Sequence, residues 1–141
     1  MIFWRRHARP DRDRGASAIE LAFIAPSLML LIFFSIQASL WWYGRTVAIQ
    51  AAREGVSQLR LARDGAMYQQ IVGPATDRTR QFAEAVGRES LLDPVVTPAY
   101  DEAAGRVSVR VTGSVITLWP GPALTVTQEA FGEIERFEGD R

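Results

Sequence analysis

The chain has 141 residues, a formal net charge of zero and no cysteine; 48% of its residues are hydrophobic and 23% are charged. Without cysteine it can form no disulfide, no thiolate nucleophile, no cysteine-held iron-sulfur cluster and no thiolate zinc site. The only histidine, His7, lies near the N-terminus, so the rest of the chain lacks the usual proton shuttle and the usual transition-metal ligand. We therefore expect no enzyme activity, no cofactor and no bound metal.

All sixteen basic residues are arginine, and they are spread along the chain among sixteen acidic residues. A nucleic-acid-binding protein gathers its basic residues on one face or in one stretch. This distribution indicates a solvated surface instead, and we expect no nucleic-acid partner.

Residues 1–15 form a basic leader, with five arginines against two aspartates and a formal charge of +3. Residues 16–43 contain one side chain that is charged at neutral pH, Glu20, and the 23 positions from Leu21 to Tyr43 are uncharged. As a helix, 23 residues extend about 35 Å, which is enough to cross a hydrocarbon core of about 30 Å. The pattern predicts a membrane-spanning helix over residues 16–43.

Two other structures share part of this pattern. A buried core helix of this length would need more protein around it than residues 44–141 can supply. A cleaved secretory signal has a shorter apolar region, of roughly 7 to 15 residues, and ends in small residues. This run ends instead in Trp41, Trp42 and Tyr43.

The flanks of the run predict its orientation. Arginine-rich segments stay in the cytoplasm, and tryptophan and tyrosine favour the headgroup layer. We expect a single pass through the cell (inner) membrane, with the N-terminus cytoplasmic and residues 44–141 forming an extracytoplasmic domain. The arginines that follow the span partly offset the charge of the leader: Arg45, Arg53, Arg60 and Arg63.

The position of Glu20 in a spanning helix requires an explanation. A charge at mid-helix costs about 2.5 to 3.5 kcal/mol, and less near the interface. One reading is that it stays hydrated and interacts with the positive end of the helix dipole. Another comes from Gly15, which ends the basic leader five residues earlier. Glycine offers an unhindered backbone to a peptidase. Cleavage after it would create an ammonium group at Ala16, about one helical turn from Glu20.

This arrangement resembles the processing site of type IV prepilins, in which a membrane aspartyl peptidase cuts after the glycine and the glutamate becomes the fifth residue of the mature chain. The resemblance implies that Gly15 and Ala16 form the processing site. It also implies that Glu20 sets the register between subunits by pairing with the N-terminal amine of a neighbour. A signal anchor that is not cut remains the alternative.

Two further features narrow the resemblance: Pro26, within the apolar run, and the segment Ala51-Ala52-Arg53-Glu54-Gly55 after it. Between about Gly15 and Ala62 the chain is similar to the TadE-like proteins, which are pseudopilins or minor pilins of the tight-adherence (Flp) pilus. The resemblance implies a prepilin peptidase, other pilin-like subunits, a membrane assembly platform and the lipid bilayer as partners, and a role in assembling an adhesion pilus.

The same comparison argues against the bulk subunit of the pilus. The major Flp pilin is typically a very short chain with tyrosine after the glutamate, whereas here Leu21 follows Glu20 and cleavage would leave 126 residues. The sequence does not distinguish a TadE-type from a TadF-type protein. A signal-anchored extracytoplasmic binding protein unrelated to pili is the alternative function.

Beyond the membrane the helix is expected to continue until Gly73-Pro74 stops it. Small or apolar residues recur along one seam of it, and we interpret them as packing on the domain's own sheet rather than as a subunit contact. A second helix is expected from Asp77 to Leu92, with Phe82, Ala83 and Val86 facing inward. The seam consists of Ala48, Ala52, Gly55, Leu59, Ala62 and Ala66.

Alternating valines predict a half-buried strand around residues 107–111, preceded by a weaker strand over 95–100 and a turn over 101–105. A third strand is expected over 123–131. The fold class is therefore α+β, a membrane helix continuing into a long helix packed on a small antiparallel sheet. Asp93, Asp101 and Glu102 near the turn match no calcium loop and are interpreted as solvated acids.

Overall fold

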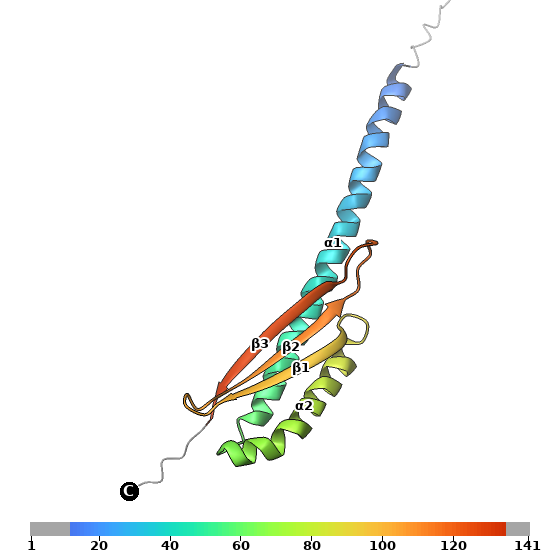
Figure 1. Cartoon of the computed structure of the whole chain (residues 1–141). Coiled ribbons are helices and arrows are strands. Elements are labelled where there is room, and N and C mark those ends of the chain that lie inside the picture. Colours follow the sequence, from blue (N-terminus) through green and yellow to red (C-terminus); the bar gives the residue numbers. More distant parts are fainter. Residues whose placement is uncertain (1–11, 135–141) are drawn as a thin grey trace, which may run out of the picture. The chain divides into compact units, whose positions relative to one another are not determined.

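The computed structural model describes residues 12–134, and side chains from residue 18 onward. Contacts between residues divide the chain into two units, 1–36 and 37–141, which are described separately. The elements follow the order α1 (Arg12–Leu59), α2 (Gly65–Gly87), β1 (Leu92–Asp101), β2 (Arg106–Val115) and β3 (Leu124–Glu133) (Figure 1). The expected α+β class is confirmed.

In the first unit, the described residues belong entirely to α1. Every described side chain from residue 18 to residue 36 is exposed, and Pro26 lies inside the helix without ending it. The hydroxyls of Ser27 and Ser35 donate to the carbonyls of Phe23 and Leu31, each at 2.8 Å. These polar side chains thus find acceptors within their own helix, which is the usual behaviour of serine in an apolar helix.

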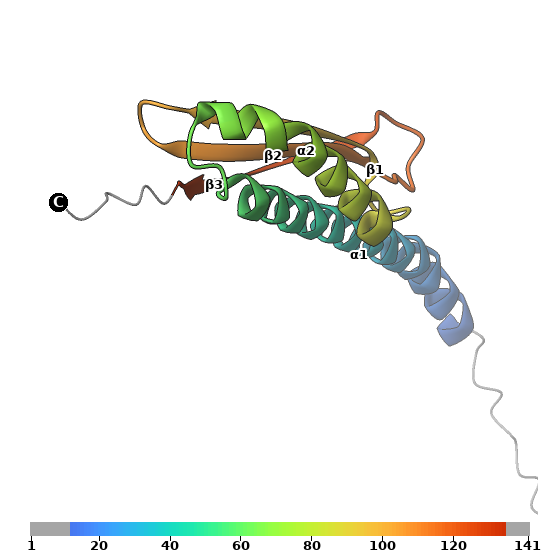
Figure 2. The same ribbon diagram turned by 90° about the horizontal axis from the view of Figure 1, so that it is seen from below.

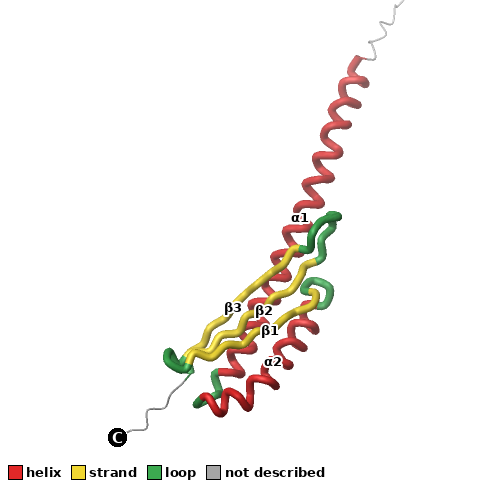
Figure 3. Tube along the Cα trace, viewed as in Figure 1, coloured by secondary structure: helices red, strands yellow, loops and turns green. Residues whose placement is uncertain are grey.

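The second unit is built on a three-stranded antiparallel sheet with strand order β1-β2-β3 (Figure 3). The valines of the central strand β2 are buried in alternation, while Arg106 and Arg110 between them are exposed. Because successive side chains of a strand point to opposite faces, one face of the sheet is apolar and buried and the other is polar. The four buried valines are Val107, Val109, Val111 and Val115.

Both helices of this unit pack on the sheet: Figure 1 shows the strands in front of α1 with α2 beside β1, and Figure 2 shows the same arrangement from below. The three elements meet at Gly55 of α1. A Cβ built on Gly55 would lie 2.7 Å from Thr79 Oγ1 of α2 and 3.1 Å from Val109 Cγ1 of β2. Glycine therefore allows α1 to approach α2 and β2 more closely than any larger residue would.

The predicted seam of small residues is largely confirmed. Five of its six members are buried, in contact with other parts of the same unit: Ala48, Ala52, Gly55, Leu59 and Ala62. They pack on the chain's own sheet and second helix, as we interpreted them. Ala66 is exposed, because α1 has already ended at Leu59 and Ala66 belongs to α2.

The expected helix stop at Gly73-Pro74 is wrong, since both residues lie inside α2. The break falls between Leu59 and Gly65, where Asp64 caps α2 by accepting the Met67 N–H at 2.7 Å. Proline removes one hydrogen-bond donor from a helix interior. Here it is exposed, so the carbonyl it leaves unpaired, that of the exposed Gln70, can bond to water.

The helix expected over 77–92 is the C-terminal half of α2, which ends at Gly87. Ala83 is buried and Phe82 half-buried, as predicted, but Val86 is exposed. The helix ends because Arg88 takes a positive φ of 43° while its N–H still donates to the Glu84 carbonyl. In the last turn the buried position is Gly87, four residues after Ala83, and not Val86.

The three predicted strands and the turn are confirmed, with ends shifted by a few residues. β1 contains Pro94 and Pro98, which are tolerated because β1 is an edge strand. In the turn, Asp101 Oδ1 accepts the Ala104 N–H at 3.0 Å and Gly105 has a φ of 60°. Asp101 is therefore a turn residue.

The outer face of the sheet carries a cross-strand ion pair. Arg110 Nη2 lies 2.9 Å from Glu129 Oε2, and this hydrogen-bonded contact lowers the pKa of the Glu129 carboxyl. Thr112 and Thr127 face each other beside it, with 3.1 Å between their hydroxyl oxygens. Val95, Phe131 and, to a smaller extent, Leu92 are large apolar residues exposed on this face.

We predict that Gly55→Ala lowers the free energy of unfolding by about 1–3 kcal/mol, because its methyl group would overlap Thr79 and Val109. Gly73→Ala is the matched control. It also lies within a helix, a Cβ there meets nothing within 4 Å, and it should raise stability by about 0.5–1 kcal/mol. Denaturant unfolding of the full chain in detergent, followed by circular dichroism, measures both. Equal effects of the two substitutions would contradict the packing at Gly55.

Candidate membrane anchor and assembly helix

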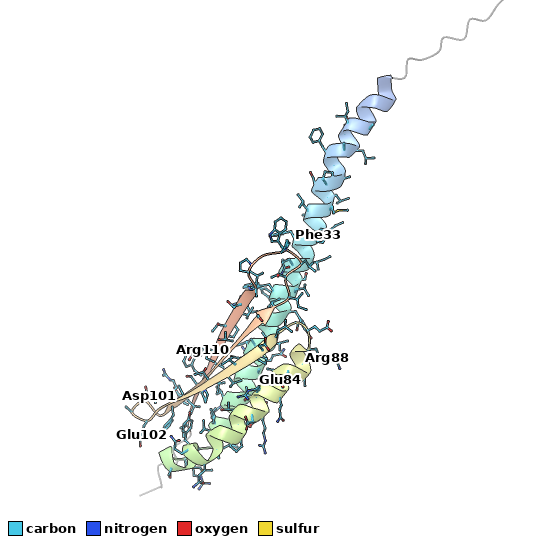
Figure 4. All side chains as sticks on the ribbon, turned by 45° about the vertical axis from the view of Figure 1, so that its right-hand side comes forward. Phe33, Glu84, Arg88, Asp101, Glu102 and Arg110 are labelled. Carbon is cyan, nitrogen blue, oxygen red and sulfur yellow. The ribbon has the colours of Figure 1, made fainter. Side chains whose placement is uncertain are left out.

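The apolar side chains of residues 18–36 lie exposed in the described structure. Among residues 12–134, α1 is the one helix long and apolar enough to cross a membrane, and none of its most apolar stretch is buried. A core helix would be covered by its own domain, so this stretch is not the core of the described domain. Its exposed large residues include Ile19, Leu21, Phe23, Ile24, Leu28, Ile32 and Phe33, the last of which is labelled in Figure 4.

The backbone groups and serine hydroxyls of this helix are also paired within the helix, as surroundings without water require. In a bilayer core each backbone polar group must be paired within the protein, which an α-helix achieves along its length. The hydroxyls of Ser27 and Ser35 are paired with carbonyls of the same helix. α1 is thus a candidate single membrane anchor.

An aromatic group marks the end of the predicted span. Trp41, Trp42 and Tyr43 are all exposed, and the Arg45 guanidinium lies 5.8 Å from the Trp41 ring centroid and 5.9 Å from that of Trp42. Gly44, which follows Tyr43, is buried. A Cβ built there would lie 2.8 Å from the Ser90 carbonyl oxygen. The change from exposed to packed side chains along α1 therefore runs from Gln37 and Leu40, which are half-buried, to Gly44, which is buried.

Gln37 is a polar residue of this region to which the sequence analysis assigned no role. Its Nε2 donates to the Ile116 carbonyl at 3.2 Å, and its Oε1 accepts the Leu118 N–H at 2.9 Å. Both ends of the amide are thus used by the loop between β2 and β3. The available signal was its position, because Gln37 is the one side-chain amide between Leu21 and Tyr43.

The predicted processing residues belong to the first turns of α1, which begins at Arg12. In this helix, Ala16 precedes Glu20 by four residues, a rise of about 6 Å. Glu20 is exposed, and no described side chain pairs with its carboxylate. Of the predicted leader, residues 1–11 lie outside the described part of the chain.

The acidic residues named near the β1–β2 turn do not gather into one site. Asp93 and Asp101 lie near opposite ends of β1, eight residues and about 26 Å apart in an extended strand. Glu102 follows Asp101 in the turn, where both are labelled in Figure 4.

A comparison with known families decides the character of the N-terminal region. Residues 15–57 match the family model described as TadE-like protein. The chain carries a TadE-like segment. The match begins at Gly15, includes Glu20 and Pro26, and ends just after Gly55. No curated protein and no solved structure matched the chain.

The TadE-like segment lies within α1, the candidate membrane helix. The structure adds a physical role for its second half. Ala48, Ala51, Ala52 and Gly55 all lie within the segment and all are buried. The TadE-like helix therefore supplies both the exposed apolar stretch and the surface on which the following α2 and sheet pack.

We predict that Ile32→Arg releases much of the chain from membranes, because an arginine near the centre of a span costs about 2.5–3.5 kcal/mol. Val95→Arg is the matched control, since Val95 is also apolar and exposed (59% against 51% for Ile32) but lies on the sheet. Retention in membrane pellets after alkaline extraction measures the difference. Full retention of the Ile32 variant would argue against a membrane span.

Proposed function

We propose that this protein is a minor pilin or pseudopilin that takes part in assembling a Flp/Tad-type adhesion pilus, with a structural rather than a catalytic role. The observation that carries the proposal is the TadE-like segment coinciding with a helix whose apolar side chains have no cover in the described chain. Such a helix needs lipid before assembly and can exchange lipid for neighbouring subunits during it. Lipid and neighbouring helices both provide apolar surroundings for these side chains.

The proposed topology is a single pass through the inner membrane. The basic leader, residues 1–15, would lie in the cytoplasm, residues 16–43 in the bilayer and residues 44–141 outside. Its support is the charge of +3 on the leader and the exposed aromatic residues at Trp41 and Trp42, which match the ordinary asymmetry of membrane helices.

A prepilin peptidase would cut between Gly15 and Ala16. The site lies within the first turns of α1, so the backbone must unwind locally to enter a peptidase cleft. Glycine in a helix interior costs about 1 kcal/mol relative to alanine, which reduces the cost of that unwinding.

Glu20 would then pair with the amine of Ala16 on an adjacent subunit. Its carboxylate is exposed, and no described side chain of its own chain pairs with it. An unpaired charge at the edge of the bilayer is costly, and an ammonium partner offsets that cost. The electrostatic requirement of Glu20 would therefore favour one register between neighbouring helices.

We predict that Gly15→Ala blocks maturation, because a Cβ and a more stable helix both hinder entry into the peptidase. Gly73→Ala, at an open position of α2, is the control and should mature normally. N-terminal sequencing of membrane-derived protein from cells with the peptidase reads the result: a chain that begins at Ala16 supports processing. Retention of residues 1–15 in the unmodified protein would favour a plain signal anchor and a binding function unrelated to pili.

We predict that Glu20→Gln still matures but assembles at least about tenfold less, the equivalent of roughly 1.4 kcal/mol for a lost charged hydrogen bond. Glu54→Gln is the control, because Glu54 is an exposed glutamate of the same helix outside the predicted span. Crosslinking to other pilin-like subunits and recovery in sheared pili report assembly. Equal assembly of the two variants would contradict the registration role.

A further inference from the structure

The loop between β2 and β3, residues 116–123, exposes an uncharged apolar tip. Leu118 is 45% and Trp119 is 74% exposed, and Pro120, Gly121 and Pro122 follow them. The chain has no charged residue between Arg110 and Glu129, so the entire tip of this hairpin is uncharged. Leu118 and Trp119 are neighbours, so they form a small exposed apolar patch, the kind of surface found where a protein contacts a membrane or a partner.

The loop is bonded to the anchoring helix itself. The Gln37 amide pairs with the Ile116 carbonyl and with the Leu118 N–H, so the residue beside Trp119 is fixed against α1. Gln37 precedes Tyr43 by six residues, or about 9 Å of helix on the side of the predicted span. The loop therefore reaches α1 at or below the aromatic residues that mark the membrane surface.

The backbone of the loop also suits a partly apolar medium. Pro120 and Pro122 carry no N–H, and the N–H of Leu118 is already paired with Gln37. Unpaired donors are what exclude irregular backbone from lipid. The loop presents fewer of them than an ordinary loop of its length.

The opposite end of the sheet has the contrary character. The β1–β2 turn exposes Asp101, Glu102 and Arg106, of which the two acids are labelled in Figure 4. Charged side chains of this kind favour water over the interior of a bilayer. The tip of the β2–β3 hairpin is thus uncharged and that of the β1–β2 hairpin charged, while Arg88 and Glu89 are exposed at the α2–β1 connection, close to Ile116.

We propose that the β2–β3 loop is a second membrane contact, in which Leu118 and Trp119 insert into the headgroup layer of the bilayer that α1 spans. This inference rests on the proposed membrane anchor. Indole rings favour the headgroup layer because they are apolar in body and polar at one N–H. The contact is continuous with the anchor through Gln37, and it limits how far residues 37–134 can tilt on the membrane surface.

Depth-dependent quenching tests the contact. Trp4, Trp41 and Trp42 are replaced by phenylalanine so that Trp119 is the one fluorophore, and the full chain is reconstituted in phosphatidylethanolamine/phosphatidylglycerol vesicles doped with brominated phosphatidylcholine. We expect Trp119 to lose about half or more of its emission, most with bromines near the headgroup. The control is Phe131→Trp with Trp119→Phe, at a similarly exposed position on the far part of β3, and it should lose little.

A second variant tests whether Gln37 positions the loop. Gln37→Leu removes both hydrogen bonds to the loop while keeping the helix apolar, and it should reduce the quenching of Trp119 toward that of the control. Quenching that is unchanged in Gln37→Leu would overturn the positioning role of Gln37.

Alkaline extraction of the same vesicles separates the two proposals. If the chain stays in the membrane but Trp119 is quenched no more than Trp at position 131, the loop contact is wrong and the anchor stands. If the chain is extracted, the anchor fails and the loop contact fails with it.

Discussion

The apolar side chains of residues 18–36 must be covered by something outside the described chain, and this requirement governs how the protein can work. The helix pairs its own backbone and serine hydroxyls, so it needs only an apolar surround. A bilayer supplies that surround for a single subunit, and the helices of neighbours supply it in an assembly. In the proposed assembly, Glu20 would add a further demand, which is a positively charged partner.

The second half of the TadE-like helix packs against other parts of its own chain. Its small residues are already used, because Ala48, Ala52 and Gly55 are buried and Gly55 abuts Thr79 and Val109. They are therefore not available as a contact seam between subunits. Within α1, the exposed stretch before Gln37 is what remains for contacts outside the chain, while buried residues after Gly44 hold the unit of residues 37–134 together.

The parts of this structure that sequence could predict are those with a strong local signal. The apolar run, the alternating valines of β2 and the glycine-containing turn each carry such a signal, and the structure has a helix, a strand and a turn at these places. The predicted helix break is misplaced because Gly73 and Pro74 are residues that usually end a helix. In α2 the buried contacts of Ala75, Thr79 and Ala83 outweigh their cost. The cap at Asp64 was the better signal. The partners of Gln37 lie 79 and 81 residues later in the chain, so no local pattern could have found them.

The two prolines of β1 limit unwanted pairing between the sheet and a strand of another molecule. A sheet of three strands has two open borders, and each could recruit a strand from another molecule. Pro94 and Pro98 interrupt the row of donors along one border. The β3 border, Leu124–Glu133, contains no proline, so its row of donors is not interrupted in this way. Unwanted pairing with a strand of another molecule would therefore begin at β3.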